Sequence, residues 1–91
     1  MERIMDKYFL NVLVRDRLDI LNRITTLFIQ KYLPVECVSY NSTADNMAVI
    51  NLICFCPDEN IMKRIVNQAN TMVDVSEVYY TKAYKAASKF F

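Results

Sequence analysis

The chain has 91 residues, of which 54% are hydrophobic, and 11 basic against 10 acidic side chains leave a net charge of +1. A chain of this length forms one domain and hides only about 60–65% of its unfolded surface, so a subunit partner would add stability. Because there is no basic surplus, we expect no binding to nucleic acid or to a membrane surface. The chain has no histidine, which excludes histidine-dependent catalysis and removes the commonest metal ligand.

The apolar segments are too short to cross a bilayer. The longest run, Met47 to Cys56, is interrupted by Asn51, whereas a spanning helix needs about 20 apolar residues. Residues 1–6 lack the apolar centre of a signal peptide. We therefore expect a cytoplasmic protein.

Three cysteines, Cys37, Cys54 and Cys56, lie inside apolar segments. In a cytoplasmic protein such cysteines are usually buried small hydrophobic residues. Two neighbouring strand thiols and one distant cysteine supply too few ligands for a metal site. The chain also has no glycine, so we expect Asn or Asp wherever the backbone needs a positive φ, and Asp45-Asn46 is a predicted tight hairpin turn.

A first strand is predicted from Tyr8 to Val14, after a polar lead-in at residues 1–7. Apolar side chains occur at both the even-numbered and the odd-numbered positions of this stretch, and Asn11 interrupts the odd-numbered ones. A strand that is apolar on both faces lies in the middle of a sheet or under a partner.

A helix is predicted from Ile20 onward, because five apolar side chains recur at helical spacing. They are Ile20, Leu21, Ile24, Leu27 and Phe28. Asp16 or Asp19 can cap this helix, and Pro34 prevents it from continuing. The preceding turn, Arg15 to Leu21, is where helix N–H groups stay free, so it is the natural place for a small anionic ligand.

Two strands follow. Val35 to Thr43 alternates imperfectly and carries several polar residues, which is typical of a strand at a sheet edge. Met47 to Phe55 has apolar residues on both faces and is predicted to be central. Asn51 interrupts its second face as Asn11 does in the first strand, and two buried amides on neighbouring strands can pair.

The last third of the chain predicts a second helix and a last strand. The helix starts at Pro57 with Asp58 as its cap, and its apolar stripe is Ile61, Met62, Ile65, Val66, Ala69 and Met72. The strand runs from Val73 to Tyr80. Residues 82–91 carry Tyr84, Ala87 and Phe91 on one helical face, which is typical of a short terminal helix.

The order β-α-β-β-α-β over residues 8–81 predicts an α+β, ferredoxin-like fold, with one four-stranded antiparallel sheet and both helices on one face. Nothing in the chain would then cover the second apolar face of the central strands, and such a patch usually marks a subunit interface. This fold serves many functions. An RNA-recognition domain needs stacking aromatics that Asn46 to Ile53 lacks, and the first turn has no C-x-x-C motif of the copper-chaperone type.

Several motifs resemble those of ACT domains, in particular the regulatory small subunit of acetolactate (acetohydroxyacid) synthase. They are the apolar first strand, Leu21 with Arg23, Leu27-Phe28, Val35-Glu36, and Met72 to Val78. The last stretch resembles the family's Leu-Val-Asp-Val-x-x-Val. The resemblance covers roughly residues 8–80, and because the chain ends at Phe91 it is similar to the short, ACT-only type.

The resemblance implies a non-catalytic regulatory subunit that activates the catalytic large subunit of acetolactate synthase and forms a homodimer through its sheet edges. It implies no cofactor in this chain, because thiamine diphosphate, magnesium and FAD would belong to the catalytic partner. The alternative is a free-standing ACT-domain amino-acid sensor, whose dimer binds a ligand other than valine.

The resemblance also places an effector site, in degenerate form, at the first strand–helix turn. Valine-binding members have Asn-x-Pro/Ser-Gly-x-Leu where this chain has Asp16-Arg17-Leu18-Asp19-Ile20-Leu21. The implied effector-binding residues are Asp16, Leu18, Asp19, Ile20, Leu21, Pro34 and Val35. Pro34 replaces an asparagine that a neighbouring subunit offers. Asp19 replaces the glycine and adds a side chain and a negative charge where a carboxylate would land, so we expect valine feedback to be weak or absent.

Overall fold

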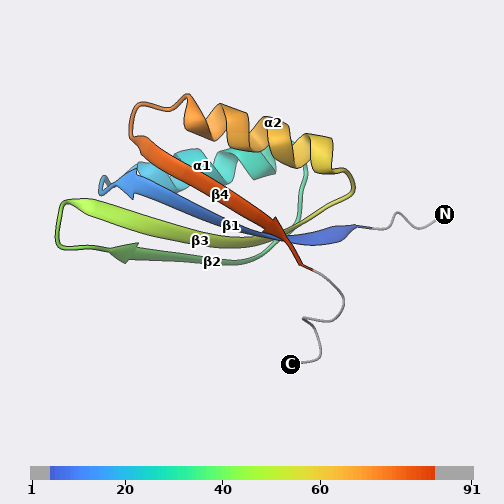
Figure 1. Ribbon diagram of the computed structural model, residues 1–91, viewed down its shortest axis with the longest axis horizontal. Coiled ribbons are helices and arrows are strands. Elements are labelled where there is room, and N and C mark those ends of the chain that lie inside the picture. Colours follow the sequence, from blue (N-terminus) through green and yellow to red (C-terminus); the bar gives the residue numbers. More distant parts are fainter. Residues whose placement is uncertain (1–4, 84–91) are drawn as a thin grey trace.

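Helices and strands follow one another in the predicted order (Figure 1), over residues 5–83, which are the residues that the computed structural model describes. They are β1 (Asp6–Arg15), α1 (Ile20–Ile29), β2 (Val35–Ser42), β3 (Met47–Cys56), α2 (Glu59–Asn70) and β4 (Val75–Lys82). The predicted α+β, ferredoxin-like fold is confirmed. Of the predicted terminal helix, Lys82 belongs to β4, and residues 84–91 lie outside the described residues.

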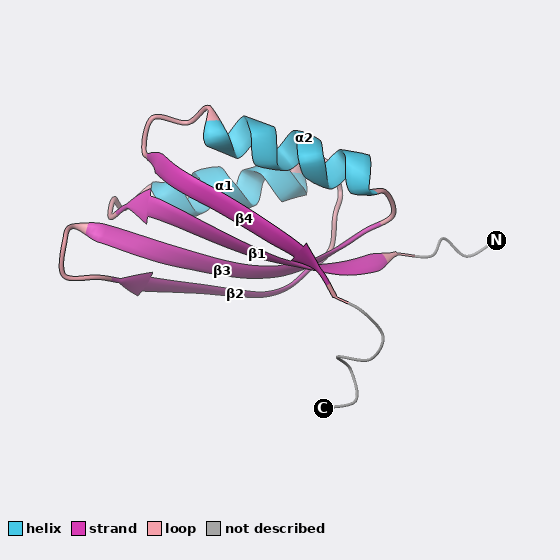
Figure 2. Ribbon diagram, in the orientation of Figure 1, coloured by secondary structure: helices cyan, strands magenta, loops and turns pink. Residues whose placement is uncertain are grey.

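The strands form one antiparallel sheet in the order β2-β3-β1-β4. β1 and β3 are central, as their two-sided apolar pattern predicted, and β2 is at an edge, as its polar residues predicted. β1 pairs with β3 along its whole length, from Asp6 opposite Cys56 to Arg15 opposite Met47. Both helices cover the same face of the sheet, and no described element covers the other face (Figure 2).

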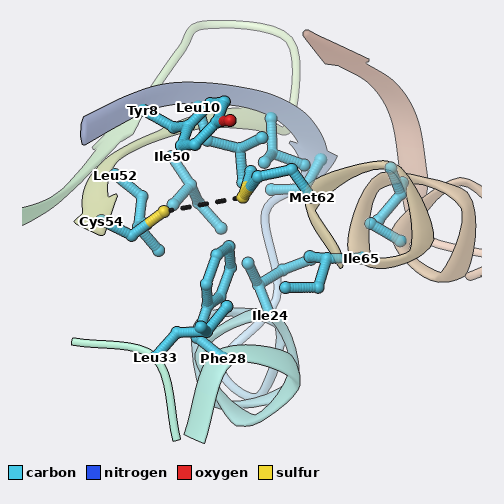
Figure 3. Packing of buried hydrophobic residues seen from close by; sticks show 14 of the residues in the cluster. Tyr8, Leu10, Ile24, Phe28, Leu33, Ile50, Leu52, Cys54, Met62 and Ile65 are labelled. Atoms are coloured by element: carbon cyan, nitrogen blue, oxygen red, sulfur yellow. Dashed lines mark hydrogen bonds between the residues drawn. The ribbon is translucent and has the colours of Figure 1, made fainter. Parts of the chain in front are cut away.

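One hydrophobic core lies between the helices and the covered face of the sheet. The fully buried helix residues recur at a spacing of three or four: Ile20, Ile24 and Phe28 from α1, and Met62, Ile65 and Ala69 from α2. In Figure 3, Phe28 and Met62 point into the same core as Cys54 of β3, whose thiol lies 3.8 Å from the Met62 sulfur. Each large side chain buried in this way contributes about 1.5–3 kcal/mol. This packing fixes α1, and with it the turn that precedes it.

Two residues adopt the positive φ for which other chains use glycine. Asn46 has φ 60° in the predicted hairpin turn between β2 and β3. Tyr32 has φ 56° just after α1, where its N–H bonds to the Ile29 carbonyl at 3.0 Å. The expectation of Asn or Asp at such positions is confirmed at Asn46 and wrong at Tyr32. The turn is held by this bond and by the bond from the next N–H, that of Leu33, to the Phe28 carbonyl at 3.1 Å.

Two further predictions are corrected by the structure. The last strand begins at Val75 rather than Val73, because the Val75 N–H bonds back to the Met72 carbonyl at 3.1 Å and closes a turn. Val73 is consequently 95% exposed. Cys54 and Cys56 are buried as predicted, but Cys37 is exposed, because it lies opposite Ile53 on the uncovered face of an edge strand.

The predicted amide pair forms between the central strands. Asn11 and Asn51 are opposite each other in the register of β1 and β3, and the Asn11 side-chain amide donates to Asn51 Oδ1. The pair lies on the uncovered face, so within one chain it is not buried as expected: Asn11 is exposed and Asn51 is half-buried.

Candidate functional site

The candidate site is the turn between β1 and α1, at the end of the sheet where β1 stops. The Arg15 N–H bonds to the Asp74 carbonyl at 2.8 Å, and the Asp16 N–H bonds to the Asn46 carbonyl at 2.9 Å. These bonds fasten the turn to the loop before β4 and to the β2–β3 hairpin. The position of the turn is therefore set by two other parts of the chain.

Tyr40 of β2 holds the carboxylate of Asp16. Its hydroxyl donates to Asp16 Oδ1 at 2.5 Å and lies 3.5 Å from the Arg17 carbonyl oxygen. The hydrogen bond from Tyr40 lowers the pKa of Asp16 below its ordinary value and raises the pKa of Tyr40, because it stabilises the carboxylate and the neutral phenol. At neutral pH the site therefore presents a fixed, ionised carboxylate.

A small open pocket of about 220 Å³ lies beside this carboxylate, lined by Asp16, Arg17, Leu18, Leu21 and Tyr40. Two leucine side chains and a tyrosine ring make most of its wall apolar. Leu18 is fully exposed. The pocket thus combines an apolar wall with one anionic oxygen acceptor, which suits a small molecule that carries an apolar group and a hydrogen-bond donor or a cation.

The predicted carboxylate cap of α1 is wrong for both candidates. Asp16 accepts from Tyr40 instead, and Asp19 occupies the cap position without a side-chain cap bond. The backbone of Asp19 is helical, at φ −95° and ψ −7°, whereas a capping residue needs an extended backbone. Asp58 shows the contrast: at φ −146° and ψ 127° its side chain accepts from the Asn60 N–H at 2.9 Å, so the predicted cap of α2 is confirmed.

Within one chain the seven residues of the predicted effector site do not come together. Asp16, Leu18 and Leu21 line the pocket, while Ile20 is fully buried in the core and faces no ligand. Asp19 lies outside the pocket lining, and its carboxylate is 3.7 Å from Arg17 Nε.

Pro34 and Val35 lie at the opposite end of the sheet. Val35 is level with Tyr8, whereas Ser42, seven residues further along β2, is level with Val14 beside the turn. Seven strand residues span about 23 Å. A contribution of Pro34 to the pocket must therefore come from another chain, and it stays a prediction.

An arginine cluster around Asp74 was not found from the sequence. The Asp74 side chain is 11% exposed and lies within 3.9 Å of Arg15 Nε, 3.7 Å of Arg17 Nε and 3.6 Å of Arg23 Nη1. Arg15 and Asp74 also line a second open pocket, of about 340 Å³. No local pattern signals this cluster, because it joins residues that are some fifty positions apart. Asp74 therefore pairs with the three arginines near the turn.

The structure supports neither a metal centre nor a membrane span in the part of the chain that it describes. No three His, Cys, Asp or Glu side chains in residues 5–83 are placed to hold a metal ion. No helix among these residues has the length and apolar composition to cross a bilayer.

Comparisons with known proteins return solved structures alone, since no protein-family model and no curated protein matches the chain. The ACT domain of GTP pyrophosphokinase from Chlorobium tepidum is 14% identical with a TM-score of 0.74, over 86% of this chain and 100% of that chain. The C-terminal domain of the MgtC protein from Mycobacterium tuberculosis is 12% identical with a TM-score of 0.75, over 94% and 96%. Ribosomal protein S6 from Thermotoga maritima is 11% identical with a TM-score of 0.70, over 96% and 95%.

The likeness is one of fold. An ACT domain and a ribosomal protein fit the same backbone at similar scores, so the ferredoxin-like fold is shown and the function must be argued from the site.

Proposed function

We propose that this protein is a non-catalytic regulatory domain of the ACT type, which works in the cytoplasm and binds a small effector at the β1–α1 turn. The observation that carries this proposal is the pocket of about 220 Å³ at that turn, with a fixed carboxylate and an apolar wall. The presence of ACT domains among the similar structures agrees with it. The absence of histidine argues against acid–base catalysis by this chain.

The partner that we propose is the catalytic large subunit of acetolactate synthase. Support comes from the sequence motifs, above all Met72 to Val78, because the structural likeness does not separate one ACT protein from another. In this proposal the chain acts through conformation: docking stabilises the active state of the large subunit. The large subunit carries the thiamine diphosphate, magnesium and FAD, and this chain carries no cofactor.

A homodimer through the β2 edges would complete the pocket. If β2 of one copy pairs antiparallel with β2 of the other, the start of each strand lies beside the end of its partner. Pro34 and Val35 of one copy then approach Asp16 and Tyr40 of the other. The exposure of Val35 and Val38 on this edge, 37% each, is consistent with such pairing.

Valine feedback should be weak or absent in this arrangement. Asp16 is ionised and bound to Tyr40, so it does not attract a carboxylate. Asp19 puts a side chain where the valine-binding members have glycine, which prevents a ligand from approaching the backbone closely.

The test measures acetolactate formation by the catalytic subunit of the same organism, with and without this protein, each with and without valine. We expect stimulation that valine does not change. Stimulation that valine abolishes would show that the substituted turn still binds it. No stimulation together with no co-purification would refute the subunit proposal.

The second candidate is a free-standing sensor of a different amino compound. The ionised carboxylate of Asp16 beside an apolar wall favours it, because an ammonium group would pair with this carboxylate. A gene for the catalytic subunit next to the gene for this protein would favour the synthase subunit instead.

A further inference from the structure

The uncovered face of the sheet carries three rows of side chains, each running across β4, β1, β3 and β2. The register gives a first row of Thr81, Phe9, Ile53 and Cys37, a middle row of Tyr79, Asn11, Asn51 and Ser39, and a third row of Glu77, Leu13, Val49 and Asn41. On the central strands, the amide pair of the middle row therefore lies between two apolar rows. No described element lies over this face (Figure 2).

We propose that this face binds the same face of a second copy of the chain, through a two-fold axis that runs along the middle row. Such an axis places the middle row against itself and the first row of one copy against the third row of the other. Phe9 then lies over the partner's Leu13, and Ile53 lies over the partner's Val49. Apolar side chains meet apolar side chains on both sides of the amides.

The amide pair is self-complementary about the same axis. Asn11 donates to Asn51 within one chain, and this bond leaves the Asn51 amide as a donor and the Asn11 side-chain oxygen as an acceptor. The axis puts Asn11 over the partner's Asn11 and Asn51 over the partner's Asn51, so the donor of each copy lies diagonally across from the acceptor of the other, one strand spacing of about 4.8 Å to the side. The torsions of the two asparagine side chains would have to bridge this offset. A buried polar pair of this kind is tolerated when each group has a partner.

The charges on the face also permit this contact. Glu77 is the charged residue of the three rows and lies on the edge strand β4. The axis puts it over the partner's Thr81 rather than over a second carboxylate. Beyond the three rows, the axis puts Lys7 over the partner's Arg15, one cation over another. Each of them already has a carboxylate in its own chain, since Lys7 is 3.2 Å from Glu36 and Arg15 Nε is 3.9 Å from Asp74.

The area of the face is sufficient for a specific dimer. Four strands at a spacing of about 4.8 Å and about eight residues of 3.3 Å each make a face of about 26 Å by 19 Å, or about 500 Å² per copy. Two copies together bury about 1,000 Å² before the relief of the side chains is added, which is the lower limit for a specific interface. Two sheets that face each other in this way pack about 10 Å apart.

This contact is distinct from the β2 edge pairing and does not depend on it. If both form, the assembly contains four chains. If the edge pairing does not form, the face contact gives a dimer. Because either contact alone also gives a dimer, the mass of the wild-type protein does not separate the two proposals, whereas a substitution on the face removes only the face contact.

The first experiment introduces a carboxylate on the face and compares it with the same change elsewhere. Val49→Glu puts a charge in the third row, whereas Val73→Glu puts it at a position that is 95% exposed and off the face. In sedimentation velocity at matched concentration, we expect Val49→Glu to halve the mass, from four chains to two or from two to one. Val73→Glu should leave it unchanged. Circular dichroism of each variant checks that it is folded.

The second experiment tests the axis itself. Ile53→Lys alone should also halve the mass. Because Ile53 lies over the partner's Val49, a mixture of Val49→Glu chains with Ile53→Lys chains should restore the wild-type mass, since each glutamate then meets a lysine. Failure of this mixture to associate, while each single variant dissociates, would overturn the proposed axis.

Two results would overturn the proposal as a whole. One is a monomeric wild-type protein, and the other is an oligomer whose mass neither Val49→Glu nor Val73→Glu changes. In the second case, co-purification with the catalytic subunit is also measured, and its loss in Val49→Glu would assign the face to the catalytic subunit instead of a second copy.

Discussion

Tyr8 offers a test of the core because its hydroxyl is buried without a hydrogen-bond partner among the described residues. The side chain is 0% exposed, its ring lies 6.1 Å from that of Tyr80, and burial raises the pKa of the phenol. Tyr8→Phe keeps the ring and removes the unpartnered hydroxyl. An unsatisfied buried polar group costs about 1–3 kcal/mol, so we expect the variant to be more stable by about this amount. For a domain of this size, about 1 kcal/mol corresponds to a rise in Tm of about 4–8 °C.

Urea denaturation followed by circular dichroism measures this change. The matched control is Tyr80→Phe, which removes a hydroxyl that donates to Glu59 Oε2 at 2.9 Å, and this variant should not gain stability. A second readout is alkaline unfolding. Because burial raises the pKa of Tyr8 in the folded state, the folded protein holds the phenol proton more tightly than the unfolded chain does. The free energy of unfolding should therefore fall as the pH rises from about 10 through the folded pKa. Tyr8→Phe should flatten this fall. A less stable Tyr8→Phe protein would refute the reasoning, since it would mean that the hydroxyl is hydrogen-bonded in solution.

Three further predictions concern the site and the thiols. The bond from Tyr40 lowers the pKa of Asp16 below 3.8, so this bond stabilises the fold above that pH, and the stabilisation is lost as the pH falls through the folded pKa. Tyr40→Phe should therefore lose less stability than the wild type between pH 5 and pH 2.5. Equal losses in urea titrations would contradict this. Burial raises the pKa of Cys54 from 9.0 to about 12 and also keeps its thiol from the solvent. At pH 8 it should therefore react with a disulfide reagent far more slowly than exposed Cys37. Cys37→Ser should abolish the fast phase, and a fast phase that survives would contradict this. Asp19→Gly combined with Asp16→Asn should raise the affinity for valine in calorimetry, and unchanged binding would show that neither lost backbone approach nor charge closed the pocket.

The fold was predictable because its signals are local and agree with one another. The two-sided apolar pattern placed β1 and β3 at the centre of the sheet, and Asn11 and Asn51 were expected to pair because each interrupts the same kind of face. The features that the sequence predicted wrongly depend on more than the spacing of apolar residues. Cysteine is a residue type that is usually buried, but the register of the edge strand puts Cys37 on the uncovered face.

Capping shows the same limit on a smaller scale. Asp19 and Asp58 are the same residue type at the same position relative to a helix, and sequence reasoning treats them alike. Only the extended backbone of Asp58 brings its carboxylate to a helix N–H. The helical backbone of Asp19 turns its carboxylate to Arg17 instead. A motif can thus name the candidate residues of a turn without fixing which of them meets a ligand.

The contacts that set the chemistry of the site come from distant strands. Tyr40 of β2 fixes Asp16, and Asp74 before β4 engages three arginines, one of which also contacts Asp19. The turn therefore lies among paired charges rather than in an excess of negative charge. It follows that the side chain at position 19, rather than its charge, is the main obstacle to a ligand carboxylate at the start of α1. Asp19→Asn should then leave valine binding weak, whereas Asp19→Gly should strengthen it; equal gains in calorimetry would assign the obstacle to charge.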